Sequence, residues 1–131
     1  MSQRISYTKI ENELWPEYRD RLNKAESTED VKKFFGYTAT ELLAQVLEPK
    51  GIKPRTEDVR LDPEGDRSYV LSTRLAERSE VADLLAGSDL SDILQRLARA
   101  AVKRFQHLSR NPDRSRFGTY YDKSRTGSLN R

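Results

Sequence analysis

The residues best placed to do chemistry in this sequence are cations in its last third. They recur every three or four residues, the spacing that places side chains on one face of an α-helix. This set, the basic stripe, consists of Arg96, Arg99, Lys103, His107 and Arg110. A row of cations attracts anions, either the carboxylates of a protein surface or the phosphates of a nucleic acid. A solvated helix that carries acids early and bases late has the same pattern, because both charges oppose the helix dipole.

The positive charge continues to the end of the chain. Residues 96–131 hold ten Lys and Arg against two acids, whereas the whole chain has 24 basic and 21 acidic residues, so residues 1–95 are net acidic. Aromatic side chains lie among the late cations, an arrangement suited to stacking on unpaired bases. The further candidates for binding a partner or a nucleic acid are Arg114, Arg116, Tyr120, Tyr121, Lys123 and Arg125. Residues 112–131 are polar and lack periodicity, which predicts a flexible basic tail.

Histidine and cysteine chemistry is restricted by composition. The chain has no cysteine, which excludes disulfides, thiolate metal sites and cysteine nucleophiles. The single histidine, His107, has Lys103 and Arg110 as its neighbours on the helical face. These cations disfavour both protonation of the imidazole and a bound metal ion. We therefore interpret His107 as a surface residue.

The acidic residues also lack a catalytic or metal-binding pattern. Three carboxylates within residues 62–66 resemble part of a calcium loop, but the full ligand spacing and the closing glutamate are missing. Pro63 and Gly65 already account for a turn there. Glu11, Glu13 and Glu17 are scattered acids whose spacing favours no reaction. We expect no enzyme, no cofactor and no metal site.

Two amphipathic segments around Gly87 have the outline of a helix-turn-helix. In that motif the first residues of the second helix usually contact the bases. Here those residues include Asp89 and Asp92, which phosphates would repel. If a nucleic acid binds, the later turns and the tail are the better candidates.

Apolar periodicity predicts a mainly α-helical fold. A first helix is expected from about residue 12 to residue 25, with Pro16 in its first turn, residues 3–10 extended or irregular, and Trp15 as a core anchor. Ser27 and Gly36 bound a short second helix, and a capping-box pattern at Thr38 and Glu41 predicts a third over 39–48. A fourth runs from about 73 to 87, and the longest from 89 to 109 with Ser88 as its cap.

Residues 49–67 contain three prolines and two glycines, which places them outside helix. Apolar residues alternate on both sides of the 62–66 turn, a pattern compatible with a short β-hairpin near residues 58–72. In the longest helix, Leu94, Leu97, Ala101 and Phe105 are expected to face the core.

The sequence thus predicts a compact bundle of four to five helices over residues 1–111, followed by the tail at 112–131. The first residues contain no apolar stretch of signal-peptide length, and no apolar run in the chain is long enough for a bilayer, so we expect a cytoplasmic location and no membrane partner. No small-molecule substrate is evident. We interpret the protein as a non-enzymatic adaptor or regulatory subunit that binds another protein or a second copy of itself. The alternative is an accessory protein that binds RNA or DNA through the basic stripe and the tail.

Overall fold

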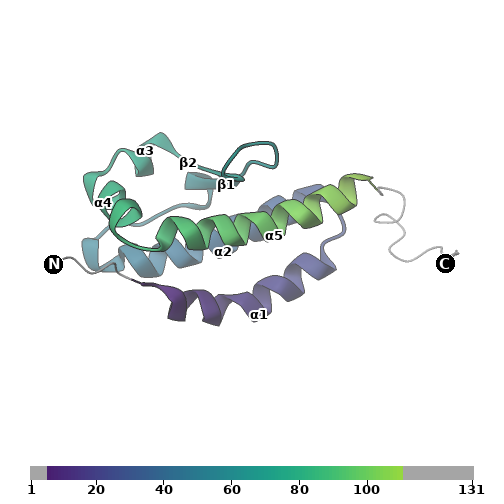
Figure 1. Ribbon diagram of the computed structural model, residues 1–131, viewed down its shortest axis with the longest axis horizontal. Helices are drawn as coiled ribbons and strands as arrows, with labels where there is room; N and C mark the ends of the chain where they lie inside the picture. Colours follow the sequence, from purple (N-terminus) through teal and green to yellow (C-terminus); the bar gives the residue numbers. More distant parts are fainter. Residues whose placement is uncertain (1–5, 111–131) are drawn as a thin grey trace, which may run out of the picture.

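A computed structural model describes residues 6–110, which form a mainly α-helical fold. Three long helices make the bundle: α1 (Thr8–Lys24), α2 (Thr28–Leu47) and α5 (Leu90–Arg110). Figure 1 shows α1 and α5 lying along α2. Between α2 and α5 the chain forms two short 3-10 helices (Glu48–Lys50 and Thr56–Asp58), strands β1 (Val59–Leu61) and β2 (Tyr69–Leu71), and helices α3 (Thr73–Ala76) and α4 (Ser79–Gly87). The predicted fold class is confirmed. The predicted tail lies outside the described residues.

Helix α1 begins four residues earlier than the sequence predicts, so the extended or irregular state expected up to residue 10 is wrong for residues 8–10. Pro16 lies inside the helix instead of in its first turn. Its ring leaves the carbonyl one turn earlier without an N–H donor, but this face of α1 is exposed and water can replace the donor. The helix start is fixed from a distance, because the Tyr7 N–H donates to Asp89 Oδ1 at 2.8 Å.

Helix α2 is continuous, so the prediction of two helices separated at residues 36–38 is wrong. Its start is as expected, with Ser27 Oγ accepting from the Asp30 N–H at 3.1 Å. Gly36 and Thr38, predicted to end one helix and cap the next, are both buried inside α2. Packing on several sides stabilises the helix at these positions. It outweighs the low helix propensity of glycine and threonine.

The segment predicted as one helix from residue 73 to 87 forms two, α3 and α4, separated at Glu77 and Arg78. Helix α5 agrees closely with its prediction. Ser88 Oγ accepts from the Leu90 N–H at 3.1 Å, so Ser88 does satisfy an amide at the start of this helix.

The hairpin is confirmed. Strands β1 and β2 pair antiparallel with Val59 opposite Leu71 and Leu61 opposite Tyr69. The Asp62 N–H donates to the Ser68 carbonyl at 2.8 Å, which closes the turn. The buried Val59 and Leu61 side chains attach the hairpin to the bundle, as a two-stranded sheet requires.

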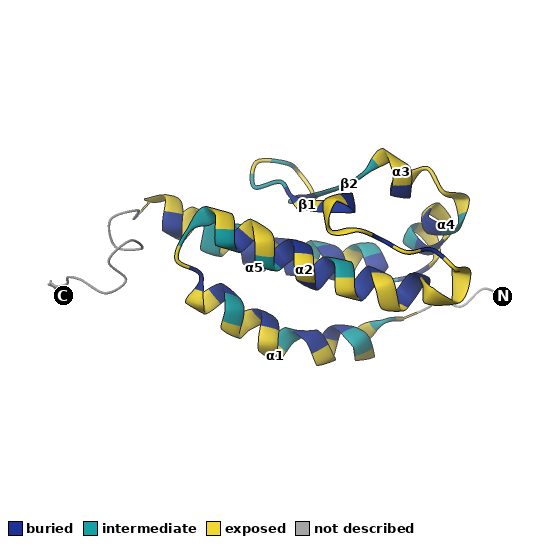
Figure 2. Ribbon diagram, turned by 180° about the vertical axis from the view of Figure 1, so that it is seen from behind, coloured by how far each residue is buried: buried dark blue, intermediate teal, exposed yellow. Residues whose placement is uncertain are grey.

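The core follows the apolar face of α5. Leu94, Leu97 and Ala101 are fully buried, as predicted, and Figure 2 shows one buried face along each long helix. Phe105 differs: it is only partly buried, and the Lys32 ammonium lies 5.6 Å from its ring centroid. No helix within residues 6–110 is long and apolar enough to cross a membrane.

Candidate binding surface

The basic stripe lies on the solvent side of α5. All five of its residues are exposed, whereas the opposite face of the helix forms the core. The other six predicted binding residues lie outside the described part of the chain: Arg114, Arg116, Tyr120, Tyr121, Lys123 and Arg125. The structure therefore brings together only the helical half of the predicted site.

Arg96 differs from the rest of the stripe because its charge is paired within the molecule. Its Nε lies 2.8 Å from Glu11 Oε2 and its Nη2 lies 2.8 Å from Glu11 Oε1. This bidentate ion pair links α1 to α5, and its carboxylate is largely desolvated because Glu11 is only 4% exposed. Arg96 therefore positions the helices and contributes little net charge to the surface.

Trp15 joins the same network. Its indole Nε1–H donates to Glu11 Oε2 at 2.9 Å, the oxygen that also accepts from Arg96. The Arg19 guanidinium carbon lies 4.9 Å from the centre of the Trp15 ring system, within the range of a cation–π contact. Sequence reasoning treated Glu11 as a scattered acid and did not include Arg19. The four-residue spacing of Glu11, Trp15 and Arg19 was the signal available for finding them together.

The network fixes the protonation state of Glu11. The hydrogen bond from Arg96 lowers the pKa of this carboxyl, burial opposes it by raising the pKa, and the bond from Trp15 lowers it further. The pKa of Glu11 falls below its ordinary value, so the side chain is ionised at neutral pH and Arg96 remains engaged.

Two cations in the middle of the stripe have no partner of this kind. Within residues 6–110, no ion pair joins Arg99 or Lys103 to a carboxylate. At the end of the helix, Arg110 Nε donates to the Gln106 carbonyl at 3.3 Å. We call Arg99, Lys103 and Arg110 the basic face of α5.

Arg104, on the side of α5 nearer α1, has a structural role. Its Nη2 donates to the carbonyls of Asn23 at 3.1 Å and Ala25 at 3.0 Å. These carbonyls end helix α1, where a cation complements the helix dipole. Arg104 at one end and Arg96 nearer the other therefore hold α1 parallel to α5 and leave the basic face open.

The start of α5 is engaged by the chain that leads into α1. Asp89 Oδ2 accepts from Ser6 Oγ at 2.8 Å and from Thr8 Oγ1 at 3.2 Å, in addition to the bond from Tyr7. Burial raises the pKa of Asp89, but these hydrogen bonds outweigh it and the pKa is lowered. A helix-turn-helix protein would present this turn to a DNA groove. Here it is covered by the first described residues, which argues against that use of α4 and α5.

No group of three or more metal-ligating side chains gathers anywhere in residues 6–110. The acidic turn at 62–66 is held by its own backbone, with the Gly65 N–H donating to the Asp62 carbonyl at 3.1 Å. Comparison of the chain with protein-family models, curated proteins and solved structures finds no significant match.

Proposed function

We propose that this protein is a non-enzymatic adaptor that binds an acidic surface of a partner protein through the basic face of α5. The observation that carries the proposal is the exposure of Arg99 and Lys103 on a core helix, with no carboxylate of the described chain paired to either. Cations left unpaired in this way steer a negatively charged partner and set its orientation.

The rigidity of α5 supports this role. Its opposite side is buried along most of the helix, from Leu90 to Leu108. The backbone beneath the cations is therefore ordered before any partner arrives, so that binding does not have to order this part of the backbone. The ion pair of Arg96 with Glu11 secures the same helix against α1.

A protein partner is favoured over a nucleic acid by the aromatic residues. Binding of single strands combines cations with exposed rings on which bases stack. Among residues 6–110, Tyr37 is the exposed large apolar side chain, and it lies on α2, outside the basic face. Near α5, the indole N–H of Trp15 is engaged by Glu11 and its ring by Arg19. The nucleic-acid alternative therefore depends on tail residues that the structure does not describe.

The test compares two charge-matched variants of the full chain as baits in nuclease-treated lysate. Arg99→Gln with Lys103→Gln removes two cations from the basic face. Lys50→Gln with Lys53→Gln removes two exposed cations near the end of α2 and is the control. We expect the first variant to lose a specific partner at least tenfold, measured by quantitative mass spectrometry, and the control to retain it. Equal recovery with both variants would contradict the proposal.

The same partner, once purified, gives a second measurement. Its affinity should fall as salt rises, because exposed charges are screened over about 10 Å at 0.1 M salt. The Arg99→Gln, Lys103→Gln variant should show a weaker dependence on salt than the control.

The nucleic-acid alternative has its own measurement. If a generic oligonucleotide binds at low salt, replacing all three cations of the basic face with Gln should reduce the log–log salt slope by up to about three units, one per phosphate contact. Binding of this kind, together with a partner that is captured from untreated lysate but not from nuclease-treated lysate, would replace the adaptor proposal with the nucleic-acid one.

A further inference from the structure

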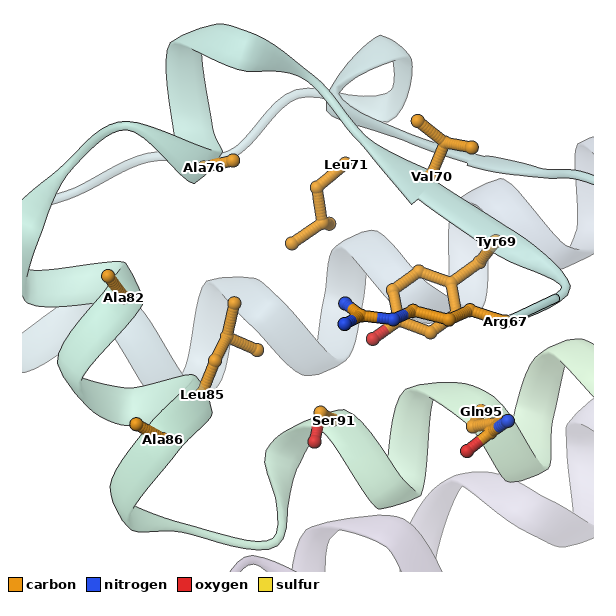
Figure 3. Close-up of a pocket in the computed structure, with 10 residues that line it drawn as sticks. All are labelled: Arg67, Tyr69, Val70, Leu71, Ala76, Ala82, Leu85, Ala86, Ser91 and Gln95. Atoms are coloured by element: carbon orange, nitrogen blue, oxygen red, sulfur yellow. The ribbon is translucent and has the colours of Figure 1, made fainter. Parts of the chain in front are cut away.

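An open hollow lies where the hairpin, α3 and α4 arch away from the first turns of α5. Its volume is about 760 Å³, within the usual range for small-molecule sites. Figure 3 shows the hollow bounded by β2 and α3 above, by α4 at one side and by α5 below. It lies at the opposite end of α5 from Lys103 and Arg110 of the basic face.

One part of the wall is apolar. Leu71 and Leu85 extend toward each other from β2 and α4, and the remaining surface there carries only short side chains. The lining residues of this part are Val70, Leu71, Ala76, Ala82, Leu85 and Ala86. None of them is fully buried, so apolar surface is left in contact with water. Covering such a surface is favourable by about 25 cal/mol per Å².

The other part of the wall is polar and positive. Arg67 and Tyr69 extend into the hollow from the hairpin, and Ser91 and Gln95 rise from α5 beneath them (Figure 3). Within residues 6–110, no carboxylate forms an ion pair with Arg67. Burial raises the pKa of Tyr69, Arg67 lowers it and Asp92 raises it, with a net rise. The Tyr69 hydroxyl therefore stays protonated at neutral pH and can donate a hydrogen bond beside the guanidinium.

The charge of this end selects the kind of anion. One guanidinium faces the hollow, and Asp92 lies close enough to act on Tyr69 electrostatically. A single cation with an acid nearby suits a group of one negative charge better than a doubly charged phosphate. A planar carboxylate matches the fork of an arginine. The apolar end requires that this carboxylate carry a hydrocarbon body.

We propose that the hollow binds a medium-chain fatty acid, with its carboxylate at Arg67 and its chain against Leu71, Leu85 and the alanines of α4. The hydroxyl of Tyr69 is the second donor to the carboxylate. The sequence alone predicted no small-molecule ligand because the residues that line the hollow come from the hairpin, α3, α4 and α5, which only the fold brings together. This site is independent of the proposed adaptor function.

The test measures binding of dodecanoate to the full chain by calorimetry, below the concentration at which dodecanoate forms micelles. Dodecyltrimethylammonium, which has the same chain and the opposite charge, is the comparison ligand. We expect saturable binding of one dodecanoate, at least tenfold tighter than the ammonium compound. Absence of saturable binding, or equal affinity for both compounds, would overturn the proposal.

Two pairs of variants locate the site. Arg67→Gln should weaken dodecanoate binding at least tenfold, since the carboxylate loses a charged hydrogen-bond donor. Arg60→Gln, which removes an exposed cation of β1, should leave it unchanged. Ala82→Phe should block the apolar end, whereas Ala44→Phe on exposed α2 surface should not. Equal effects of Arg67→Gln and Arg60→Gln would show general attraction to a positive protein and would overturn the assignment. Circular dichroism confirms that each variant is folded.

Discussion

Buried carboxylates organise much of this structure at the scale of single residues. Asp58, whose side chain is 3% exposed, precedes the hairpin and accepts hydrogen bonds from three directions. The Arg55 N–H and the Ser72 hydroxyl each donate to it at 2.7 Å, and the Arg74 guanidinium forms an ion pair with it. One side chain thus joins the segment before the hairpin to the helix after it. No local sequence pattern indicated this role, because the partners of Asp58 are up to sixteen residues away.

The state of Asp58 predicts how stability depends on pH. Burial alone would raise the pKa of Asp58, but the hydrogen bonds from Arg74, Arg55 and Ser72 outweigh it and lower the pKa to about 2. A carboxyl whose pKa is lowered by folding stabilises the protein at pH values above its pKa in the unfolded state. This contribution is lost as the pH falls toward its pKa in the folded state. The unfolding free energy should therefore be highest above about pH 5 and lose roughly 2 kcal/mol from this residue between about pH 4 and pH 2.

Asp58→Asn tests this assignment in chemical denaturation curves at several pH values. The variant should be less stable than the wild type at pH 7 by about 2 kcal/mol and nearly equal to it at pH 2. Asp66→Asn, which changes an exposed carboxylate in the hairpin turn, should have little effect at either pH. A constant difference between Asp58→Asn and the wild type at all pH values would contradict the assignment.

Arg96 and Glu11 allow a second residue-scale prediction. Arg96→Met leaves a buried carboxylate without its cation, so we expect a loss of about 2 kcal/mol, the usual cost of 3–5 kcal/mol being reduced by the partial exposure of Arg96. Adding Glu11→Leu should recover part of that loss, because no buried charge remains. Emission of Trp15, the single tryptophan, should change in both variants, since its N–H partner is altered.

Arg99→Met serves as the matched control on the same helix. It should change stability by less than about 0.5 kcal/mol, as is usual for surface positions. If Arg96→Met changed stability as little as Arg99→Met, the contacts at Glu11 would contribute nothing measurable to folding.

At the scale of elements, sequence patterns predicted α5 and the hairpin, but they placed the start of α1 too late, divided α2 and missed the break between α3 and α4. The apolar spacing of α5 was strong enough to give its length within a residue or two. The start of α1 depends on Asp89, which lies eighty-two residues from Tyr7, and no local pattern contains that information. Gly36 and Thr38 have the local chemistry of a helix break, but burial against several neighbours keeps α2 intact.

Glycine substitutions test the continuity of α2. A Cβ at Gly36 would meet only Thr56 Cγ2, at 3.9 Å, an ordinary van der Waals contact. Because the backbone there is helical, Gly36→Ala should raise the unfolding free energy by about 0.5–1 kcal/mol. Gly51 has φ of +70°, so Gly51→Ala should lower it by about 1 kcal/mol. Thermal unfolding of the two variants checks the opposite signs, and destabilisation by Gly36→Ala would show that α2 does not tolerate the methyl group.

At the scale of the whole molecule, α5 connects the other two long helices with the hairpin and α4. It packs on α1 and α2, on both strands and on α4. The helical half of the candidate binding surface, the basic stripe, could be predicted because its exposure depends only on helical spacing. Its neutralised member, Arg96, could not, because pairing with Glu11 depends on how α1 lies against α5. The hollow beside Arg67 could not be predicted from local sequence patterns either, because its lining residues come from separate elements.

This arrangement predicts a single cooperative unfolding transition. Emission of Trp15 reports on α1 and α5, and circular dichroism reports on all helices, so the two denaturation curves should coincide. Separate midpoints would mean that the hairpin, α3 and α4 unfold apart from the bundle, against the single domain predicted for residues 1–111.

The position of α5 also predicts unequal costs for two core truncations. Leu97 is fully buried, and its carbonyl accepts a hydrogen bond from the Tyr18 hydroxyl at 2.6 Å. Leu97→Ala should cost about 3–4 kcal/mol, within the range for buried leucines. Phe105→Ala should cost clearly less, about 1–2 kcal/mol, because its ring is partly exposed. Denaturation at equilibrium measures both, and a greater cost at Phe105 would place its ring in the core.

The contacts of Asp58 have a consequence for protein engineering. With Arg74 bound to Asp58, the hairpin and its turn form a loop whose two ends are held together at the base. The tip is exposed at Glu64 and Asp66 and contributes nothing to the buried core. Lengthening a loop with fixed ends costs little, since each doubling adds only about 0.6 kcal/mol of closure entropy. A foreign peptide epitope inserted between Gly65 and Asp66 would be displayed on a scaffold that folds without it.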